Sequence, residues 1–177
     1  MSAVTMDETE VKHVIEPGAL RKALGTFASG VTIVTTEIDG EVFGMTANAF
    51  TSVSLDPPLV LVSIAETAKM RDRIARSGRY GVSVLCRSQE AQALQFAGVR
   101  LKKPEDTTFV WRSGVPLIDG ALVHLACSVF ASHPSGDHIL QVGLVNELWH
   151  THGEPLVFFT GAFRDLSVPQ THPEWGF

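Results

Sequence analysis

The polar side chains best suited to binding a ligand are concentrated in one short segment, residues 46–54. Polar residues occupy alternate positions there: Thr46, Asn48, Ser52 and Ser54. A continuous extended backbone would place these four on one face, where their hydroxyl and amide groups need hydrogen-bond partners. The isoalloxazine ring of a flavin offers carbonyl and nitrogen edges of the right kind, and Ala47 and Ala49 would allow it to approach closely. The alternative interpretation is a polar strand that faces solvent.

Other chemistries find less support in the residue pattern. His150 and His152 have the spacing of a metal chelate, but they flank Gly153 at an expected turn and no third ligand is evident, so we predict no metal site. The chain contains no GxSxG motif and no serine at a diagnostic distance from a histidine and an acid, which disfavours a hydrolase. Gly136-Asp137-His138, taken alone, is typical of a turn.

Composition and charge describe an ordinary globular chain. Of the 177 residues, 45% are hydrophobic and 19% charged, which suits a single packed domain. A net charge of -5 argues against a nucleic-acid partner, which would require a basic surface. Cys86 and Cys127 lie in apolar runs and are expected to be reduced core thiols. No apolar stretch is long enough to cross a membrane, and the polar first residues lack signal-peptide features, so we expect a cytoplasmic protein.

The first half of the chain has the signals of one helix and an antiparallel hairpin. Pro17 is suited to the first turn of a helix, and residues 30–36 are rich in β-branched residues, which favours a strand. Asp39-Gly40 is a preferred two-residue hairpin turn, so the chain should return through residues 42–46. Residues 59–64 are apolar enough for a strand buried on both faces.

The second half continues with short helices and longer strands. We expect helices over residues 69–76 and 88–97, with Ser88 as the N-cap of the second, and a long loop over residues 98–120. The strands expected here span residues 80–85, 122–132, 139–149 and 156–160. Strands joined by hairpins, without the GxGxxG motif of a dinucleotide-binding fold, predict a mainly β, antiparallel Greek-key barrel or sandwich.

Several short motifs, in order, resemble the flavin reductase family, whose fold is the FMN-binding split β-barrel. The matching strings are Phe27-Ala28-Ser29-Gly30-Val31-Thr32, Gly44-Met45-Thr46-Ala47-Asn48-Ala49-Phe50, Ser52-Val53-Ser54-Leu55-Asp56-Pro57-Pro58-Leu59, Phe96-Ala97-Gly98, Gly136-Asp137-His138 and Pro155-Leu156. They run from about residue 18 to residue 166, nearly the whole chain. The resemblance implies a flexible arm over residues 1–15, one domain over residues 16–166 and a tail over residues 167–177.

Some details resemble the reductases that serve phenol-type hydroxylases, and two depart from many relatives. Ala68-Lys69-Met70 and the Phe96-Ala97-Gly98 string carry the closer likeness. Thr107-Thr108 stands where many members have a lysine before the phenylalanine. Ala68 replaces the Ser or Thr that many relatives use near the flavin phosphate, which shifts the expected phosphate contact to Lys69.

The resemblance also implies roles for individual residues. The implied flavin-binding residues are Thr46, Ala47, Asn48, Ser52, Ser63, Ile64, Lys69, Phe96 and Ala97. Among them, Ser63 and Ile64 would meet the ribityl-phosphate end, and Lys69 the phosphate itself. His138 is the implied catalytic residue, packed beside the nicotinamide, and Asp137 would orient it.

By the same resemblance, the chain is expected to transfer a hydride from NADH or NADPH to FAD or FMN. The implied assembly is a homodimer with each flavin near the subunit interface, and the reduced flavin would pass to a separate monooxygenase. Two alternatives stay open: a non-enzymatic flavin-binding electron carrier, and a flavin-dependent amine oxidase on the same fold. Hydride transfer is the cofactors' own chemistry and needs no nucleophile or triad.

Overall fold

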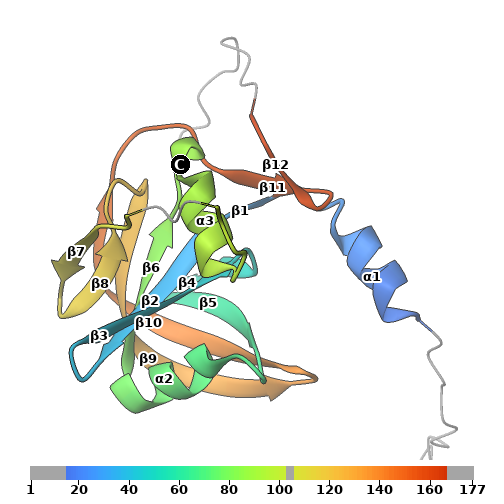
Figure 1. Ribbon diagram of the computed structural model, residues 1–177. Coiled ribbons are helices and arrows are strands. Elements are labelled where there is room, and N and C mark those ends of the chain that lie inside the picture. Colours follow the sequence, from blue (N-terminus) through green and yellow to red (C-terminus); the bar gives the residue numbers. More distant parts are fainter. Residues whose placement is uncertain (1–14, 103–105, 167–177) are drawn as a thin grey trace, which may run out of the picture.

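The computed structural model describes residues 15–102 and 106–166, which form antiparallel sheets with short helices (Figure 1). The helices are α1 (Pro17–Leu24), α2 (Lys69–Ser77) and α3 (Glu90–Phe96), and a 3₁₀ turn over Arg87–Gln89 precedes α3. The strands are β1 (Ser29–Gly30), β2 (Thr32–Ile38), β3 (Glu41–Ala47), β4 (Phe50–Leu55), β5 (Pro58–Ala65), β6 (Arg79–Val84), β7 (Phe109–Arg112), β8 (Val115–Ile118), β9 (Val123–Ser135), β10 (His138–His150), β11 (Val157–Phe159) and β12 (Ala162–Arg164). The predicted tail, and the predicted arm apart from Ile15, lie outside the described residues.

Seven strands form one sheet, in the order β3-β2-β6-β9-β10-β5-β4. Its two edge strands, β3 and β4, are consecutive in sequence, with only Asn48 and Ala49 between them. The two edges must therefore approach each other, and the sheet curls into a barrel that is split between β3 and β4. At the split, the Ser63 amide of β5 donates to the Ala49 carbonyl over 3.0 Å. The predicted antiparallel split-barrel class is confirmed.

The β2–β3 hairpin forms as its turn sequence predicts. Asp39 and Gly40 have φ angles of 54° and 84°, the pair of positive values that a type I′ turn requires. The register runs from the Thr32–Ala47 pair to the Ile38–Glu41 pair. The hairpin therefore carries Thr46 and Ala47 to the split.

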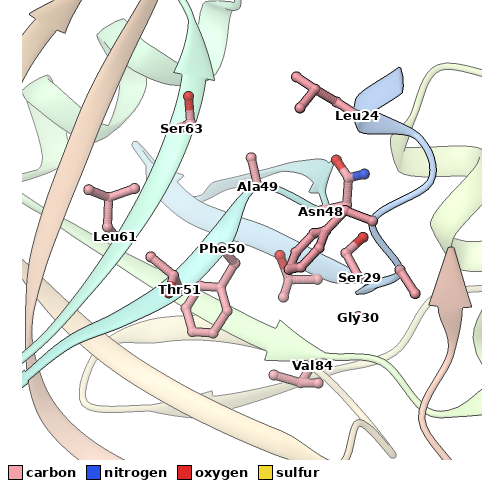
Figure 2. A pocket seen from close by; sticks show the side chains of 13 residues that line it. Leu24, Ser29, Gly30, Asn48, Ala49, Phe50, Thr51, Leu61, Ser63 and Val84 are labelled. Carbon is pink, nitrogen blue, oxygen red and sulfur yellow. The ribbon is translucent and has the colours of Figure 1, made fainter. Parts of the chain in front are cut away.

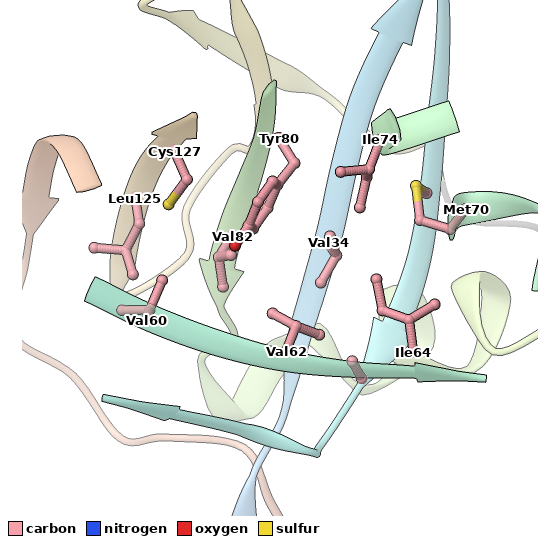
Figure 3. Packing of buried hydrophobic residues seen from close by; sticks show 11 residues of the cluster. Val34, Val60, Val62, Ile64, Met70, Ile74, Tyr80, Val82, Leu125 and Cys127 are labelled. Carbon is pink, nitrogen blue, oxygen red and sulfur yellow. The ribbon is translucent and has the colours of Figure 1, made fainter. Parts of the chain in front are cut away.

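The barrel core is built from residues of five strands, β2, β3, β5, β6 and β9, and from two residues of α2 (Figure 3). The residues buried there include Val34, Val60, Val62, Ile64, Met70, Ile74, Tyr80, Val82, Leu125 and Cys127. Alternation also corrects the prediction that β5 is buried on both faces. Val60, Val62 and Ile64 are buried, whereas Leu61 and Ser63 are only half-buried on the other face. Their partial exposure arises because β5 forms a wall of the hollow described below.

Three further predictions were wrong in detail. The expected loop over residues 98–120 contains the β7–β8 hairpin, which turns at Ser113-Gly114 with φ angles of 47° and 71°. The α3 helix begins at Glu90 rather than near Ser88, which lies inside the preceding 3₁₀ turn, so Ser88 is not its N-cap. The strand expected over residues 156–160 was predicted to be the last one, but β12 follows β11 and pairs with it.

Helix α1 stands apart from the rest of the fold. It projects from the body of the described chain (Figure 1), and none of its residues is buried. Its C-terminal end is attached through the Thr160 amide, which donates to the Gly25 carbonyl over 2.8 Å. Neither α1 nor any other helix of the described residues is both long and apolar enough to span a bilayer.

Candidate functional site

A large hollow of about 840 Å³ lies at the split of the barrel (Figure 2). We call it the split hollow. Its mainly apolar walls come from Leu24, Phe27, Ala28, Phe50, Leu61 and Val84, and its polar side chains are Ser29, Thr32, Asn48, Thr51 and Ser63. An apolar cavity of this size with a few polar groups is the usual form of a small-molecule site, for which volumes of roughly 300–1,000 Å³ are typical.

The polar groups of the split hollow include some without a protein partner. The Ser29 hydroxyl is buried and has no hydrogen-bond partner in the described chain. The Asn48 side chain is exposed and makes no hydrogen bond with any described residue, although it can both donate and accept. A flat ring that is apolar on its faces and polar along its edge fits this set of walls and groups. The residues present therefore suit a flavin ring.

A second hollow, of about 440 Å³, lies on the other side of Asn48, between α3 and the β11–β12 hairpin. We call it the α3 hollow. Thr46, Ala97 and the Phe158–Phe163 ring pair are among the residues that line it. The Thr46 hydroxyl donates to the Ala93 carbonyl of α3 over 2.6 Å, so it ties β3 to the helix. The Thr46 hydroxyl oxygen can still accept a hydrogen bond from a ligand.

Not all four residues of the alternating pattern reach the split hollow. The chain leaves the strand conformation at Asn48-Ala49, and a register shift in β4 lies between Ser52 and Ser54. The prediction of one continuous polar face was therefore wrong. From β4, Phe50 and Thr51 line the hollow, whereas Ser52 is exposed and pairs with Val60 of the core face.

Two other implied flavin contacts have their side chains in the protein interior. Ile64 and Ala47 are buried in the barrel core, and the Ala47 carbonyl accepts a hydrogen bond from the Thr32 hydroxyl over 2.6 Å. Phe96 packs over β3, where a Cβ at Gly44 would lie 2.6 Å from its ring carbons. Contacts of Ile64 and Ala47 with a ligand are thus limited to backbone groups, and a role of either residue in flavin binding stays a prediction.

Asp137 and His138 lie at the tip of the β9–β10 hairpin. His138 pairs with Ala65 of β5, and Leu140 pairs with Ser63. Residues paired across antiparallel strands project from the same face, so His138 projects on the face of β5 that lines the split hollow. Its Nδ1 donates to the Asp137 carboxylate over 2.7 Å in the tautomer that this contact favours. The hydrogen bond lowers the pKa of Asp137 below its ordinary value.

Lys69 is the first residue of α2 and is exposed. The preceding residue, Ala68, provides no side-chain cap, so the first amides of the helix lack a side-chain acceptor. No described residue forms an ion pair with Lys69. The helix N-terminus and its lysine are therefore available to an anion.

Among the described residues, the remaining titratable groups do not form a metal-binding cluster. Burial raises the pKa of the Cys127 thiol to about 12, and burial also raises the pKa of Tyr80. His150 and His152 contact each other edge to face, with ring centroids 6.3 Å apart. Within residues 15–102 and 106–166, no three potential ligands are arranged to hold a metal.

A curled antiparallel sheet with a ligand-sized hollow at its split defines the class of FMN-binding split barrels. The family model for the flavin reductase like domain matches residues 24–167. Because this match spans most of the sequence, the chain belongs to that family.

Individual relatives agree with this placement. An NADH-dependent flavin reductase from a Rhodococcus species is 58% identical, over 97% of this chain and 100% of that protein. The reductase component of 4-hydroxyphenylacetate 3-monooxygenase from Thermus thermophilus is 40% identical, over 85% and 97%. The solved structure of flavin reductase PheA2 in its native state has a TM-score of 0.84 at 45% identity and covers 87% of this chain and 100% of its own.

The sequence pattern missed several residues that line the split hollow. Ser29, Thr51 and Leu61 carry no isolated signal, because each resembles an ordinary strand residue. Ser29 lies within a string that supports the family resemblance, and that string was the one available pointer to it.

Proposed function

We propose that this chain is an NADH-dependent flavin reductase that supplies reduced FAD or FMN to a separate monooxygenase. The observation that carries the proposal is the split hollow, with apolar walls, a buried hydroxyl without a partner at Ser29 and an uncommitted amide at Asn48. Its setting in a flavin reductase domain supports the same conclusion, as do relatives named as NADH-dependent flavin reductases and as monooxygenase reductase components.

The protein's contribution to hydride transfer is binding and orientation. A bound flavin accepts a hydride when a reduced nicotinamide ring lies against it, and reacting atoms need to be roughly 3–3.5 Å apart. Asn48 would hold the polar edge of the ring, and Ser63 would provide a hydroxyl from β5. Leu61, Phe50 and Val84 would exclude water from the ring faces. No side chain has to act as a nucleophile, which suits a hollow without one.

His138 is proposed to position the nicotinamide. The Asp137 carboxylate occupies its Nδ1, so Nε2 is left to face a ligand on the split-hollow side of the sheet. A carboxylate that holds one ring nitrogen fixes the orientation of the imidazole. His138 would therefore determine how the nicotinamide lies and would not exchange a proton with the reacting atoms.

Lys69 and the N-terminus of α2 are proposed to bind the flavin phosphate. A lysine ammonium and free helix amides attract a phosphate by charge-assisted hydrogen bonds. The absence of a hydroxyl at Ala68 leaves the lysine charge as the main side-chain contribution here. Riboflavin, which has no phosphate, is the natural control ligand.

The functional unit is proposed to be a homodimer. Leu20, Leu24 and Phe27 are 47%, 63% and 81% exposed, and α1 buries nothing against its own chain. Unpartnered apolar residues of this kind usually mark an interface. Because Leu24 and Phe27 also line the split hollow, a second copy that covers them would complete each flavin site. Light scattering should give twice the chain mass, and Leu20→Glu with Leu24→Glu should reduce it.

One assay distinguishes the proposal from its alternatives. Purified protein is mixed with NADH or NADPH and excess FMN or FAD, and loss of the nicotinamide absorbance is followed. A reductase consumes the nicotinamide only when flavin is present. An electron carrier would bind flavin without turnover, and an amine oxidase would reduce its flavin with an amine instead. Coupling to a flavin-dependent monooxygenase then tests the delivery of reduced flavin.

A further inference from the structure

The tip of the β9–β10 hairpin, where Asp137 and His138 lie, has little side-chain packing of its own. Residues 132–137 are all exposed, and His138 is half-buried. Gly136 has a φ angle of 64° and begins a two-residue loop between the paired residues Ser135 and His138. Because the tip lacks buried side chains, its position depends on backbone hydrogen bonds to neighbouring segments.

One of these hydrogen bonds comes from just beyond the end of β5. The Glu66 amide donates to the Asp137 carbonyl over 2.9 Å. Ala65, the last residue of β5, pairs with His138, so this bond lies one residue farther towards the tip than the last strand pair. In Figure 1 the tip of the hairpin lies beside the chain that connects β5 to α2. The bond therefore ties the backbone next to His138 to that connection.

The connection that provides this amide is itself held firmly. The Ala68 amide donates to the Ala65 carbonyl over 2.9 Å, so residues 65–68 form a hydrogen-bonded β-turn with Glu66 at its second position. Helix α2 follows at once, and its Met70 and Ile74 side chains are buried in the barrel core. The turn thus links a fixed part of the barrel to the exposed tip of the hairpin.

We propose that the Glu66 backbone amide is a positioning group for His138 in the reductase reaction. The inference rests on the proposed role of His138 beside the nicotinamide. The Asp137 carboxylate holds the imidazole through Nδ1 over 2.7 Å, and the Glu66 amide holds the backbone of the same aspartate. Without the amide, Asp137 and the imidazole bound to it can shift relative to the split hollow. A shift of about 1 Å can cost on the order of a hundredfold in rate when reacting groups must be aligned.

Glu66→Pro removes this one donor and is compatible with the turn. Proline is favoured at the second position of a β-turn, and Glu66 does not have the positive φ angle that would exclude it. The preceding residue, Ala65, lies in a strand and so has the extended conformation that a following proline requires. The Glu66 side chain is exposed. Glu66→Ala loses the same carboxylate but keeps the amide, and is therefore the reference for the comparison.

Kinetics with NADH and calorimetric titration with FMN are measured on both variants. The value of kcat/KM for NADH should be about threefold to tenfold lower in Glu66→Pro than in Glu66→Ala, which corresponds to one net hydrogen bond. FMN affinity should be the same in both, which also shows that the proline variant is folded. Equal kcat/KM values would overturn the proposal. A matching loss of FMN affinity would also overturn it, because the damage would not be specific to the hairpin tip.

A double-mutant cycle with His138→Ala distinguishes positioning of the histidine from a general effect on the hairpin. If the amide acts through His138, Glu66→Pro should lower kcat/KM no further once the imidazole is absent. A full additional loss in that background would overturn the proposal. Normal NADH kinetics in His138→Ala alone would refute both the nicotinamide role of His138 and its positioning by Glu66, while reductase activity would stand. Wild-type protein that fails to oxidise NADH with any flavin would instead refute the proposed reductase activity.

Discussion

Replacing Asn48 with leucine tests the split hollow most selectively. The side chain lies where the two hollows meet, and its amide is not committed to any described residue. Leucine is of similar size but can neither donate nor accept, so a bound flavin would lose its hydrogen bonds to this residue. Its polar edge would be left without a partner against apolar walls.

The expected loss follows from the number of groups left unpaired. Leaving a buried donor or acceptor unsatisfied costs about 1–3 kcal/mol. Since about 1.4 kcal/mol is a tenfold change in a dissociation constant, affinity should fall by roughly tenfold to a hundredfold. The fold should survive, because an exposed side chain without protein hydrogen bonds contributes within about 0.5 kcal/mol to stability.

Calorimetric titration of FMN and FAD, with thermal unfolding alongside, measures both quantities. Ser54→Ala is the matched control, because Ser54 lies beyond the register shift in β4 and outside the split hollow. It should leave flavin affinity unchanged. Unchanged affinity in a folded Asn48→Leu protein would refute the assignment of the flavin ring to this hollow. An equal loss of flavin affinity in both variants would instead support the continuous polar face that the alternating pattern predicts.

Three further substitutions test the roles of His138, Lys69 and Tyr80. His138→Ala should raise KM for NADH or slow flavin reduction in stopped-flow experiments, while flavin affinity is retained. It should also return the pKa of Asp137 towards its ordinary value. The stability that the Asp137–His138 pair contributes at neutral pH, and that is lost as the pH falls through the lowered pKa, should then disappear. Lys69→Met should weaken FMN and FAD binding by roughly tenfold and reduce its salt dependence, but spare riboflavin; an equal loss for all three flavins would exclude Lys69 as the phosphate ligand. Tyr80→Phe removes a buried hydroxyl without a partner, so urea unfolding should show an unchanged or higher stability, by up to about 1 kcal/mol, whereas clear destabilisation would mean that the hydroxyl is hydrogen-bonded.

Strong local signals predicted the parts of the fold that local chemistry determines. Asp39-Gly40 specifies its own turn geometry, and Pro17 marks the start of α1. The β7–β8 hairpin was missed because its strands have four residues each and Pro116 interrupts one of them. Its turn, Ser113-Gly114 between two apolar runs, is a signal that could have indicated the hairpin.

The site was predictable in part, because family motifs mark which residues matter but not where their side chains point. The break at Asn48-Ala49 and the shift in β4 change the phase of the alternation. Neither is visible in a pattern that assumes one continuous strand. The approach of β3 and β4 that creates the split hollow depends on the strand order of the whole sheet, so Ser29 and Leu61 were beyond local reasoning.

Anaerobic turnover of the purified protein is the decisive measurement of whether the chain reduces flavin with a nicotinamide. NADH should be consumed only when FMN or FAD is present, with a rate that saturates in both ligands, and free reduced flavin should accumulate in equal amount. Flavin binding without NADH consumption, or NADH consumption independent of added flavin in protein that carries none, would show that the chain is not a flavin reductase.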